Sequence, residues 1–149
     1  MRITKRTNIA VRLLMYCAAN DDRLVTKAEI AERCNISENH LAQVINQLSQ
    51  RGFLNTHRGR RGGIALARKA ADIRVGDVFR QVEGAVPIVE CFGDDQDTCP
   101  QLKICRLRTA LSDATQAFFQ ALDEVTLDAL VSDGNELMDI MSPAPCVRA

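Results

Sequence analysis

The sequence predicts a mainly α-helical fold with one small β-wing. Apolar residues recur at helical spacing in residues 8–19, 26–50 and 73–84, the pattern of helices that bury one face. Two short β-like runs in residues 53–67 surround a glycine-rich reversal, and an apolar stripe runs through residues 105–131. With 149 residues, the chain has the length of one domain, or of one domain with an added oligomerisation element.

The first helix is expected in residues 8–19, where Ile9, Leu13, Tyr16 and Cys17 share one face. The charged segment around it reads as an amphipathic helix and not as a secretory signal, and no apolar run is long enough to span a bilayer. We therefore expect a cytoplasmic protein with no membrane partner. In that compartment its six cysteines are thiols or metal ligands more often than disulfides.

Residues 26–50 predict two short helices joined by a tight turn. Thr26 followed by Glu29 is a capping-box pattern that starts a helix over residues 27–34. Ser37 is a natural N-cap for a second helix over residues 38–50. This arrangement is typical of a helix-turn-helix, in which the second helix enters the major groove of DNA.

The outer face of the second predicted helix is rich in amides. Asparagine and glutamine side chains present a donor and an acceptor together to a base edge, which an ordinary solvated helix does not require. An ordinary helical hairpin with a polar outer face is the alternative. The residues on this face are Asn39, His40, Gln43, Asn46 and Gln47.

A predicted β-hairpin follows directly, with strands at residues 53–57 and 63–67 and the sequence RGRRGG between them. Its three arginines suit phosphates or a narrow minor groove. Alone, such a loop could be a solvated hairpin or bind any anion; after a helix-turn-helix it predicts a wing. The candidate DNA-binding residues are Thr26, Ser37, Asn39, His40, Gln43, Asn46, Gln47, Arg58, Arg60 and Arg61.

Charge is divided along the chain although the net charge is zero. Residues 1–70 hold thirteen Lys or Arg against five Asp or Glu, whereas residues 71–149 hold six against fourteen. The N-terminal half is therefore suited to a polyanion such as duplex DNA, and the C-terminal half is not.

Two further helices complete the predicted fold. A short one in residues 73–84 should pack against the winged helix-turn-helix. The stripe in residues 105–131 predicts a long helix with few surfaces of its own chain to cover it, so pairing with the same helix of a second subunit is expected. A helix folded back on its own domain is the alternative. The predicted fold is thus a winged helix-turn-helix plus a long dimerisation helix.

Three cysteines, Cys91, Cys99 and Cys105, lie within fifteen residues at the spacing C-x7-C-x5-C. The loop lacks the close cysteine pair and the histidine typical of zinc sites, so zinc is an alternative with little support. Three thiolates in one loop suit an iron–sulfur cluster, whose irons sit apart. Cys105 would begin the long helix, where the helix dipole favours a thiolate. Of the other cysteines, Cys17 and Cys34 read as buried apolar residues and Cys146 as a free thiol.

Together these motifs resemble the Rrf-two family of bacterial iron–sulfur repressors. The family order is an N-terminal helix, a helix-turn-helix, an RGxxGG wing, a three-cysteine loop and a dimerisation helix. The segments NHLAQVINQLSQRGF, RGRRGGIALA and IRVGDVFRQVE are similar to the nitric-oxide-sensing group, NsrR. The segments MRITKRTN, LMYCAAND and VECFGDDQDTCP are similar to the iron-responsive group, RirA.

The resemblance implies that Cys91, Cys99 and Cys105 ligate an iron–sulfur cluster, with [4Fe-4S] preferred and [2Fe-2S] as the second choice. Some members add an aspartate from the partner's first helix, and the matching residue here is Asn8. The fourth ligand is therefore open between Asn8, Glu90 and water. The implied parts are a DNA-binding domain (1–84), a cluster-binding loop (85–106), a dimerisation region (107–141) and a flexible tail (142–149).

The expected function is that of a cluster-dependent transcriptional repressor and not of an enzyme. Its expected partners are a second copy of the chain, a pseudo-palindromic DNA operator and a small signal such as nitric oxide. The alternative signal is iron or cluster status, as in the RirA and IscR groups. A third interpretation is an electron-transfer or catalytic iron–sulfur protein, and the wing arginines argue against it. A fourth is a repressor held by structural zinc.

Overall fold

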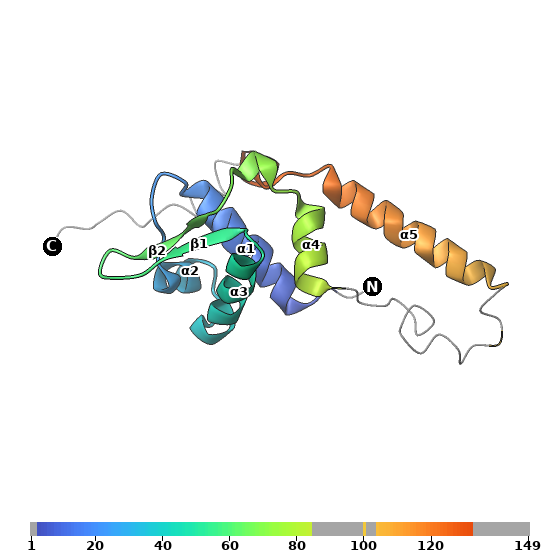
Figure 1. The fold of residues 1–149 in the computed structure, drawn as a ribbon, viewed down its shortest axis with the longest axis horizontal. Helices are drawn as coiled ribbons and strands as arrows, with labels where there is room; N and C mark the ends of the chain where they lie inside the picture. The colour runs from blue at the N-terminus through green and yellow to red at the C-terminus, as the bar shows by residue number, and fades with distance from the viewer. Residues whose placement is uncertain (1–2, 85–99, 101–103, 133–149) are drawn as a thin grey trace.

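The computed structural model describes residues 3–84, 100 and 104–132, and the fold is given for these residues (Figure 1). The cysteine positions 91 and 99, the expected tail and the end of the expected dimerisation region lie outside them. The elements in chain order are α1 (Lys5–Ala19), α2 (Lys27–Arg33), α3 (Glu38–Gln50), β1 (Leu54–His57), β2 (Gly63–Leu66), the 3-10 helix η1 (Ala70–Asp72), α4 (Val75–Glu83), α5 (Arg106–Asp123) and α6 (Leu127–Ser132).

Helix α1 lies at the centre of the fold, in contact with α3, α4, α6 and β2. It begins three residues before the predicted start because Thr4 acts as its N-cap, with Oγ1 accepting from the Thr7 N–H at 3.4 Å. The face predicted to be apolar is buried, and Leu13 and Tyr16 are fully enclosed. Helix α1 is therefore at the centre of the hydrophobic core, and the helices of the helix-turn-helix pack on this core.

The helix-turn-helix forms as the sequence predicts. Thr26 Oγ1 accepts from Glu29 N at 3.2 Å, and Glu29 Oε2 accepts from Thr26 N at 3.5 Å, which completes the capping box. Asn35 adopts a positive φ of 50° in the turn, a conformation that asparagine tolerates better than most residues. Ser37 stands at the N-cap of α3, but its hydroxyl makes no capping bond; it contacts His40 Nδ1 at 2.7 Å instead.

Strands β1 and β2 form the predicted antiparallel hairpin, with Leu54 opposite Leu66 and His57 opposite Gly63. Its turn needs glycine, because a Cβ on residue 62 would lie 2.2 Å from the His57 carbonyl oxygen. A contact that sequence patterns did not predict joins the hairpin to the segment before α2. Val25 and Ile64 exchange two backbone hydrogen bonds, of 3.0 and 2.8 Å, which form an isolated antiparallel bridge to β2.

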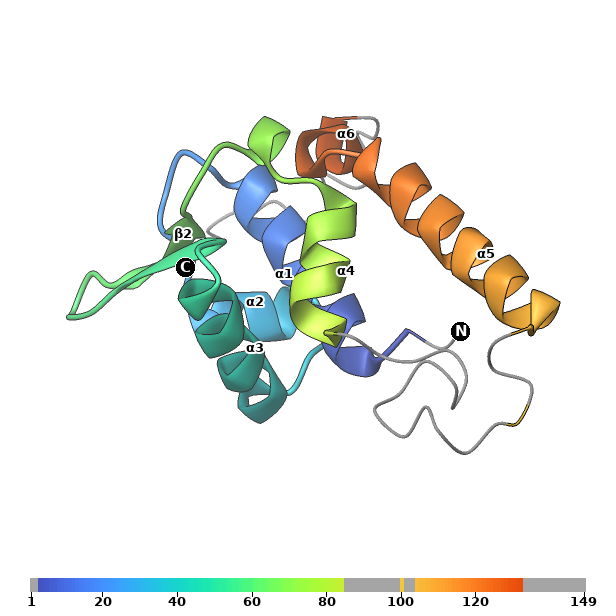
Figure 2. The same cartoon turned by 45° about the vertical axis from the view of Figure 1, so that its right-hand side comes forward.

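The C-terminal helices differ from the single long stripe that the sequence predicts. Helix α5 ends at Asp123, and α6 then packs back on α1 and η1 with Leu127 and Val131 buried. Helix α5 extends away from the rest of the molecule and has no buried residue (Figures 1 and 2). The alternative of a helix folded back on its own domain is correct for the end of the stripe, α6. Pairing of α5 with a second subunit stays a prediction.

No helix in the described ranges combines the length and apolar character that crossing a membrane requires.

Candidate nucleic-acid interface

Helix α3 presents a mainly polar face on the surface of the winged helix. Asn39, Gln43 and Asn46 are exposed along it, while the other face is buried in the core. Amide side chains on an exposed helix of this kind have the reach and the paired donor and acceptor that base edges in a major groove require. The buried residues that fix this orientation are Leu41, Val44, Ile45 and Leu48.

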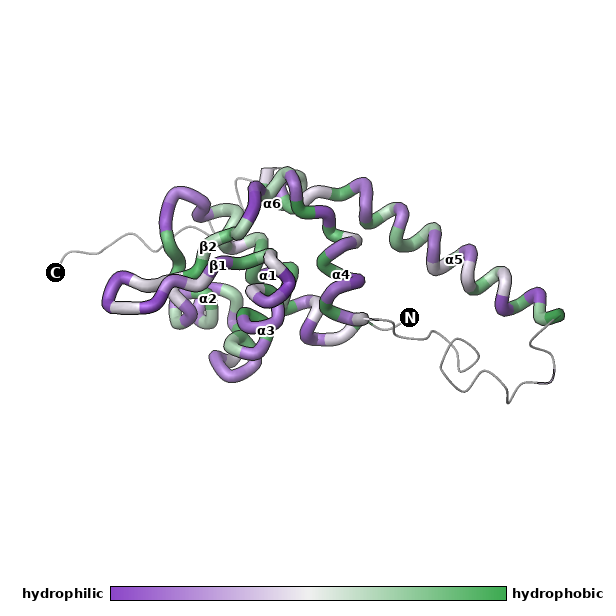
Figure 3. The backbone as a smooth tube through the Cα atoms, in the orientation of Figure 1, coloured by the Kyte–Doolittle hydropathy of each residue, from purple (hydrophilic) through white to green (hydrophobic). Residues whose placement is uncertain are grey.

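The wing lies next to α3 and carries its arginines at the tip. Arg58, Arg60 and Arg61 are all exposed on the loop between β1 and β2, which Figure 3 shows as a hydrophilic segment. A groove of about 370 Å³ runs between α3, the start of α2 and the wing, and both Asn46 and Thr26 line it. The structure therefore brings the predicted wing, the amide face and the first residue of the helix-turn-helix to one side of the molecule.

Two predicted DNA-binding residues have other contacts. Thr26 uses its hydroxyl in the capping box of α2. Gln47 is half-buried and turned towards α4, where its Nε2 donates to the carbonyl oxygens of Gln81 at 3.4 Å and Val82 at 3.3 Å. Gln47 thus joins α3 to the end of α4 and does not share the exposed face of Asn39, Gln43 and Asn46.

A half-buried ion pair with a tyrosine hydroxyl holds α1 against the helix-turn-helix, and sequence reasoning missed it. Glu29 accepts from the Tyr16 hydroxyl at 2.6 Å and from Arg23 Nη1 at 3.1 Å. Mainly because of the Arg23 hydrogen bond, the pKa of Glu29 falls to about 2. Burial, together with the neighbouring carboxylate, raises the pKa of Tyr16 to about 12. The only signal in the sequence was a charged turn beside a capping glutamate.

Of the three cysteines predicted to ligate a cluster, the structure describes Cys105. It is the N-cap of α5 and half-buried, and its Sγ accepts from Arg108 N at 3.4 Å. A sulfur that already accepts a hydrogen bond at a helix start is chemically suited to bind a cation as thiolate. Among residues 3–84, 100 and 104–132, no three His, Cys, Asp or Glu residues are grouped as a metal site. Cys91, Cys99 and Glu90 lie outside these ranges.

The other predicted ligand, Asn8, lies exposed on α1. It lines a shallow groove with Lys5, Arg12 and the start of α3. Cys17 and Cys34 are buried in the core, as expected from the sequence. Burial raises the pKa of both thiols, that of Cys17 to about 12, so these two are poor candidates for metal binding or reaction.

A joint of polar and aromatic contacts attaches α5 to α4. Nη1 and Nη2 of Arg80 donate to the two carboxylate oxygens of Asp123, at 2.7 and 2.5 Å. The same guanidinium lies 4.8 Å from the centre of the Phe119 ring. This hydrogen bonding lowers the pKa of Asp123. Gly76 permits the close approach, because a Cβ there would lie 2.0 Å from Asp123 Oδ1. The C-terminal end of α5 is thereby tied to the winged helix.

A helix-turn-helix with an adjoining two-stranded wing, packed on α1 and α4, defines a winged-helix protein of the DNA-binding type. Residues 3–133 match the Rrf2 family, described as "Iron-dependent Transcriptional regulator". The chain belongs to the Rrf2 family of transcriptional regulators.

The relatives and solved structures agree with this assignment. The chain is 38% identical over 142 residues to the HTH-type transcriptional regulator NsrR of Geobacillus kaustophilus, covering 95% of this chain and 97% of that protein. It is 43% identical over 131 residues to protein aau3 of Rhizobium meliloti, covering 88% and 85%. The structure of T. potens IscR is similar with a TM-score of 0.71 and 26% identity, covering 91% of this chain and 90% of that one.

Proposed function

We propose that this regulator is a repressor whose DNA binding depends on an iron–sulfur cluster and which senses nitric oxide. The observation that carries the DNA-binding part is the exposure of Asn39, Gln43 and Asn46 on α3 beside the arginines of the wing. A helix of amides reads base edges, and the wing arginines contact phosphates or the minor groove. Relatives that carry the name NsrR support the signal.

The residues assigned to the cluster are Cys91, Cys99 and Cys105, with Asn8 of a second copy, Glu90 or water as the fourth ligand. Thiolates are the usual ligands of iron–sulfur clusters, and a [4Fe-4S] form is preferred over [2Fe-2S]. When bound, such a cluster supplies iron that a small molecule can reach. Cys105 contributes the one thiol that begins a helix, so the position of α5 is linked to the ligand set. Thiols of this kind remain reduced in the cytoplasm, where we place the protein.

We further propose that two copies pair through α5. Its apolar side chains are only partly covered in the described chain. Leu107 is 65% exposed and Leu111 is partly exposed, while the Phe118 ring lies 6.3 Å from the Phe79 ring of α4. A symmetric pair would set the distance between two α3 helices, which must be about 34 Å to enter successive major grooves. A displacement of α5 would be transmitted to α4 through the Arg80–Asp123 hydrogen bonds. It would pass from the end of α4 to α3 through the hydrogen bonds of Gln47.

The test uses the full chain, purified and reconstituted without oxygen. Holo protein is expected to be brown and to select duplexes from a random DNA library, whereas metal-free protein binds the selected duplex far more weakly. Nitric oxide is expected to release the DNA promptly. Equal binding by holo and metal-free protein would overturn the cluster dependence, and colourless protein with stoichiometric zinc would replace the cluster with a structural metal.

Matched cysteine variants separate ligands from other thiols. Cys99→Ala is expected to lose the cluster and specific DNA binding while its circular dichroism stays that of the wild type. Cys146→Ala, outside the three-cysteine loop, is expected to keep both. Unchanged cluster content in Cys99→Ala would refute the assigned role.

Iron sensing is the second candidate, favoured by the description of the family as iron-dependent. It predicts that an iron chelator releases the DNA promptly and that nitric oxide does so only slowly. The two titrations on the same holo protein and the same duplex decide between the signals.

A further inference from the structure

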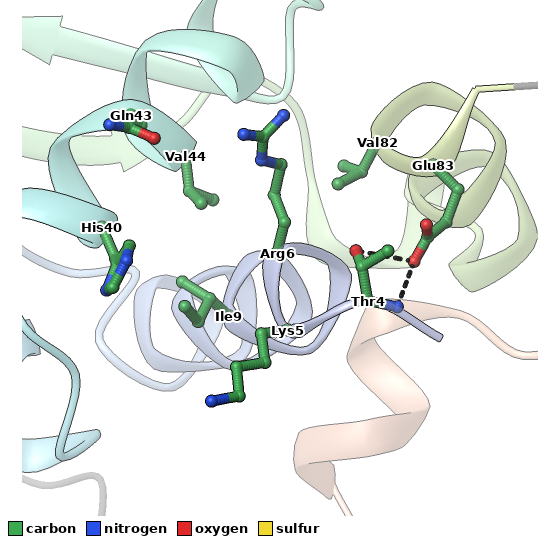
Figure 4. A pocket seen from close by; sticks show the side chains of 9 residues that line it. All are labelled: Thr4, Lys5, Arg6, Ile9, His40, Gln43, Val44, Val82 and Glu83. Atoms are coloured by element: carbon green, nitrogen blue, oxygen red, sulfur yellow. Dashed lines mark hydrogen bonds between the residues drawn. The ribbon is translucent and has the colours of Figure 1, made fainter. Parts of the chain in front are cut away.

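Helix α3 is bordered by grooves on both flanks, and the flank away from the wing includes residues of α1 and α4 that the sequence did not place in the interface. The second groove, of about 440 Å³, lies between α3, the first turn of α1 and the end of α4 (Figure 4). His40 and Gln43 line it from α3, and Lys5 and Arg6 line it from α1. We propose that Lys5 and Arg6 bind phosphates of duplex DNA on this flank, so that α3 is held from both sides.

The width of the major groove gives the first argument. It is about 12 Å wide, and a helix with its side chains is about 10–12 Å across. A helix that enters it therefore has a sugar–phosphate backbone along each flank. On one flank of α3 the structure provides Lys27 and the wing. On the other flank, the cationic side chains that line the groove beside His40 and Gln43 are Lys5 and Arg6.

The placement of the two cations gives the second argument. Both side chains are exposed, and Figure 4 shows Arg6 extending between Val44 of α3 and Val82 of α4. Lys5 leaves α1 on another side and also lines the neighbouring groove that contains Ser37. The pair therefore spans the edge of α3 from its N-cap to its middle, where a phosphate backbone would pass.

The third argument is that the first turn of α1 is fixed in position. Glu83 Oε1 accepts from Thr4 N at 2.8 Å and from Thr4 Oγ1 at 3.0 Å, which ties the start of α1 to the end of α4. Burial acts to raise the pKa of Glu83, but these hydrogen bonds and the charge of Arg6 hold it below its ordinary value. The one carboxylate among the residues that line the groove is thus hydrogen-bonded to the start of α1.

This inference rests on the proposed DNA-binding function, and its test is chosen to separate the two. The probe is a duplex that the wild-type holo chain has selected from a random library. Arg6→Ala and Lys5→Ala are compared with Lys69→Ala, which removes an exposed lysine at the N-cap of η1, an element that packs on α6. All three positions are exposed, so the variants are expected to fold as the wild type does.

Each groove variant is expected to weaken binding to every duplex about equally and to reduce the slope of log affinity against log salt by about one, as the loss of one phosphate contact does. Arg6→Lys is expected to restore most of the slope, because it keeps the charge. Lys69→Ala is expected to leave affinity and slope unchanged. If the groove variants behave like Lys69→Ala while the wild type binds DNA, the inference is wrong and the proposed function stands.

Neutral methylphosphonate linkages placed one at a time along the duplex provide the second measurement. One linkage is expected to weaken binding by the wild type and to have little further effect on Arg6→Ala. It should lie on the opposite side of the major groove from the linkage that weakens the wild type but has little further effect on Arg60→Ala. If linkages that affect Arg6 and Arg60 coincide, the two-sided arrangement is wrong. A wild-type chain that binds no duplex overturns the proposed function together with this inference.

Discussion

The winged helix and α5 are built from similar proportions of apolar residues but bury them very differently. In the winged helix, Leu13, Leu41 and Phe53 are almost fully enclosed. In α5 no residue is buried, although the apolar stripe is continuous over the helix. A helix with an apolar face and no cover is stable chiefly when something packs on it. The difference indicates that the first region folds on its own core, and it is the basis of the proposal that the second region is completed by association.

The largest expected effect tests the enclosed side of this comparison. Phe53→Ala should lower the free energy of unfolding by about 3–5 kcal/mol, because it leaves a cavity in the core. The matched change Phe118→Ala in α5 should cost less, because the Phe118 ring is half-buried against Phe79. If two copies pair through α5 as proposed, its cost should also vary with protein concentration. Urea unfolding at two protein concentrations measures both. Equal and concentration-independent costs would remove the distinction between the two regions.

The next effect tests the uncovered side. Leu111→Asp places a charge on the apolar stripe of α5 and should raise the dissociation constant of the dimer by about a hundredfold, because the charge would be buried without a partner. Gln116→Asp adds the same charge on the opposite, exposed face and should leave association unchanged. Sedimentation equilibrium measures both variants. A Leu111→Asp chain that sediments like the wild type would mean that α5 is not the contact between subunits.

The smallest effect sharpens the account of how the winged helix is held together. The pKa of Glu29 is about 2, below its ordinary 4.5, so its contacts stabilise the fold above about pH 4.5 and are lost as the pH falls towards 2. Glu29→Gln should lack this pH-dependent part of the stability, whereas the exposed Glu32→Gln should retain it.

Tyr16 reports on the same contacts because it is the one tyrosine of the chain. Its titration should have a midpoint near 12 in the wild type and move towards 10 in Glu29→Gln. Identical midpoints in the two proteins would show that the phenol and the carboxylate do not interact in solution.

Much of the winged helix could be predicted from sequence because its signals are local. A capping box sets the start of α2 from four consecutive residues, and the glycines of the wing set its reversal. What could not be predicted depends on partners distant in the chain. Gln47 lies at the border of the polar face, and only the position of α4 decides that it turns inward. The break after α5 depends likewise on the surface that α1 and η1 offer to α6.

For the candidate interface, too, local features could be predicted from sequence and long-range contacts could not. The amide face of α3 and the wing arginines follow from helical spacing and turn chemistry within one segment. Arg6 was not identified, because residues 6 and 43 come together only through the packing of α1 between α3 and α4. A cationic side chain near the start of a helix has no distinguishing sequence signal of its own.

The two backbone bonds between Val25 and Ile64 have a mechanical consequence for the wing. They attach β2 at Ile64, near the loop end of the hairpin, to the residue before α2. The strands therefore cannot swing without also moving the helix-turn-helix. The wing should follow α3 as one rigid unit, so that the position of α3 in a groove also sets where the arginines of the loop reach the DNA backbone.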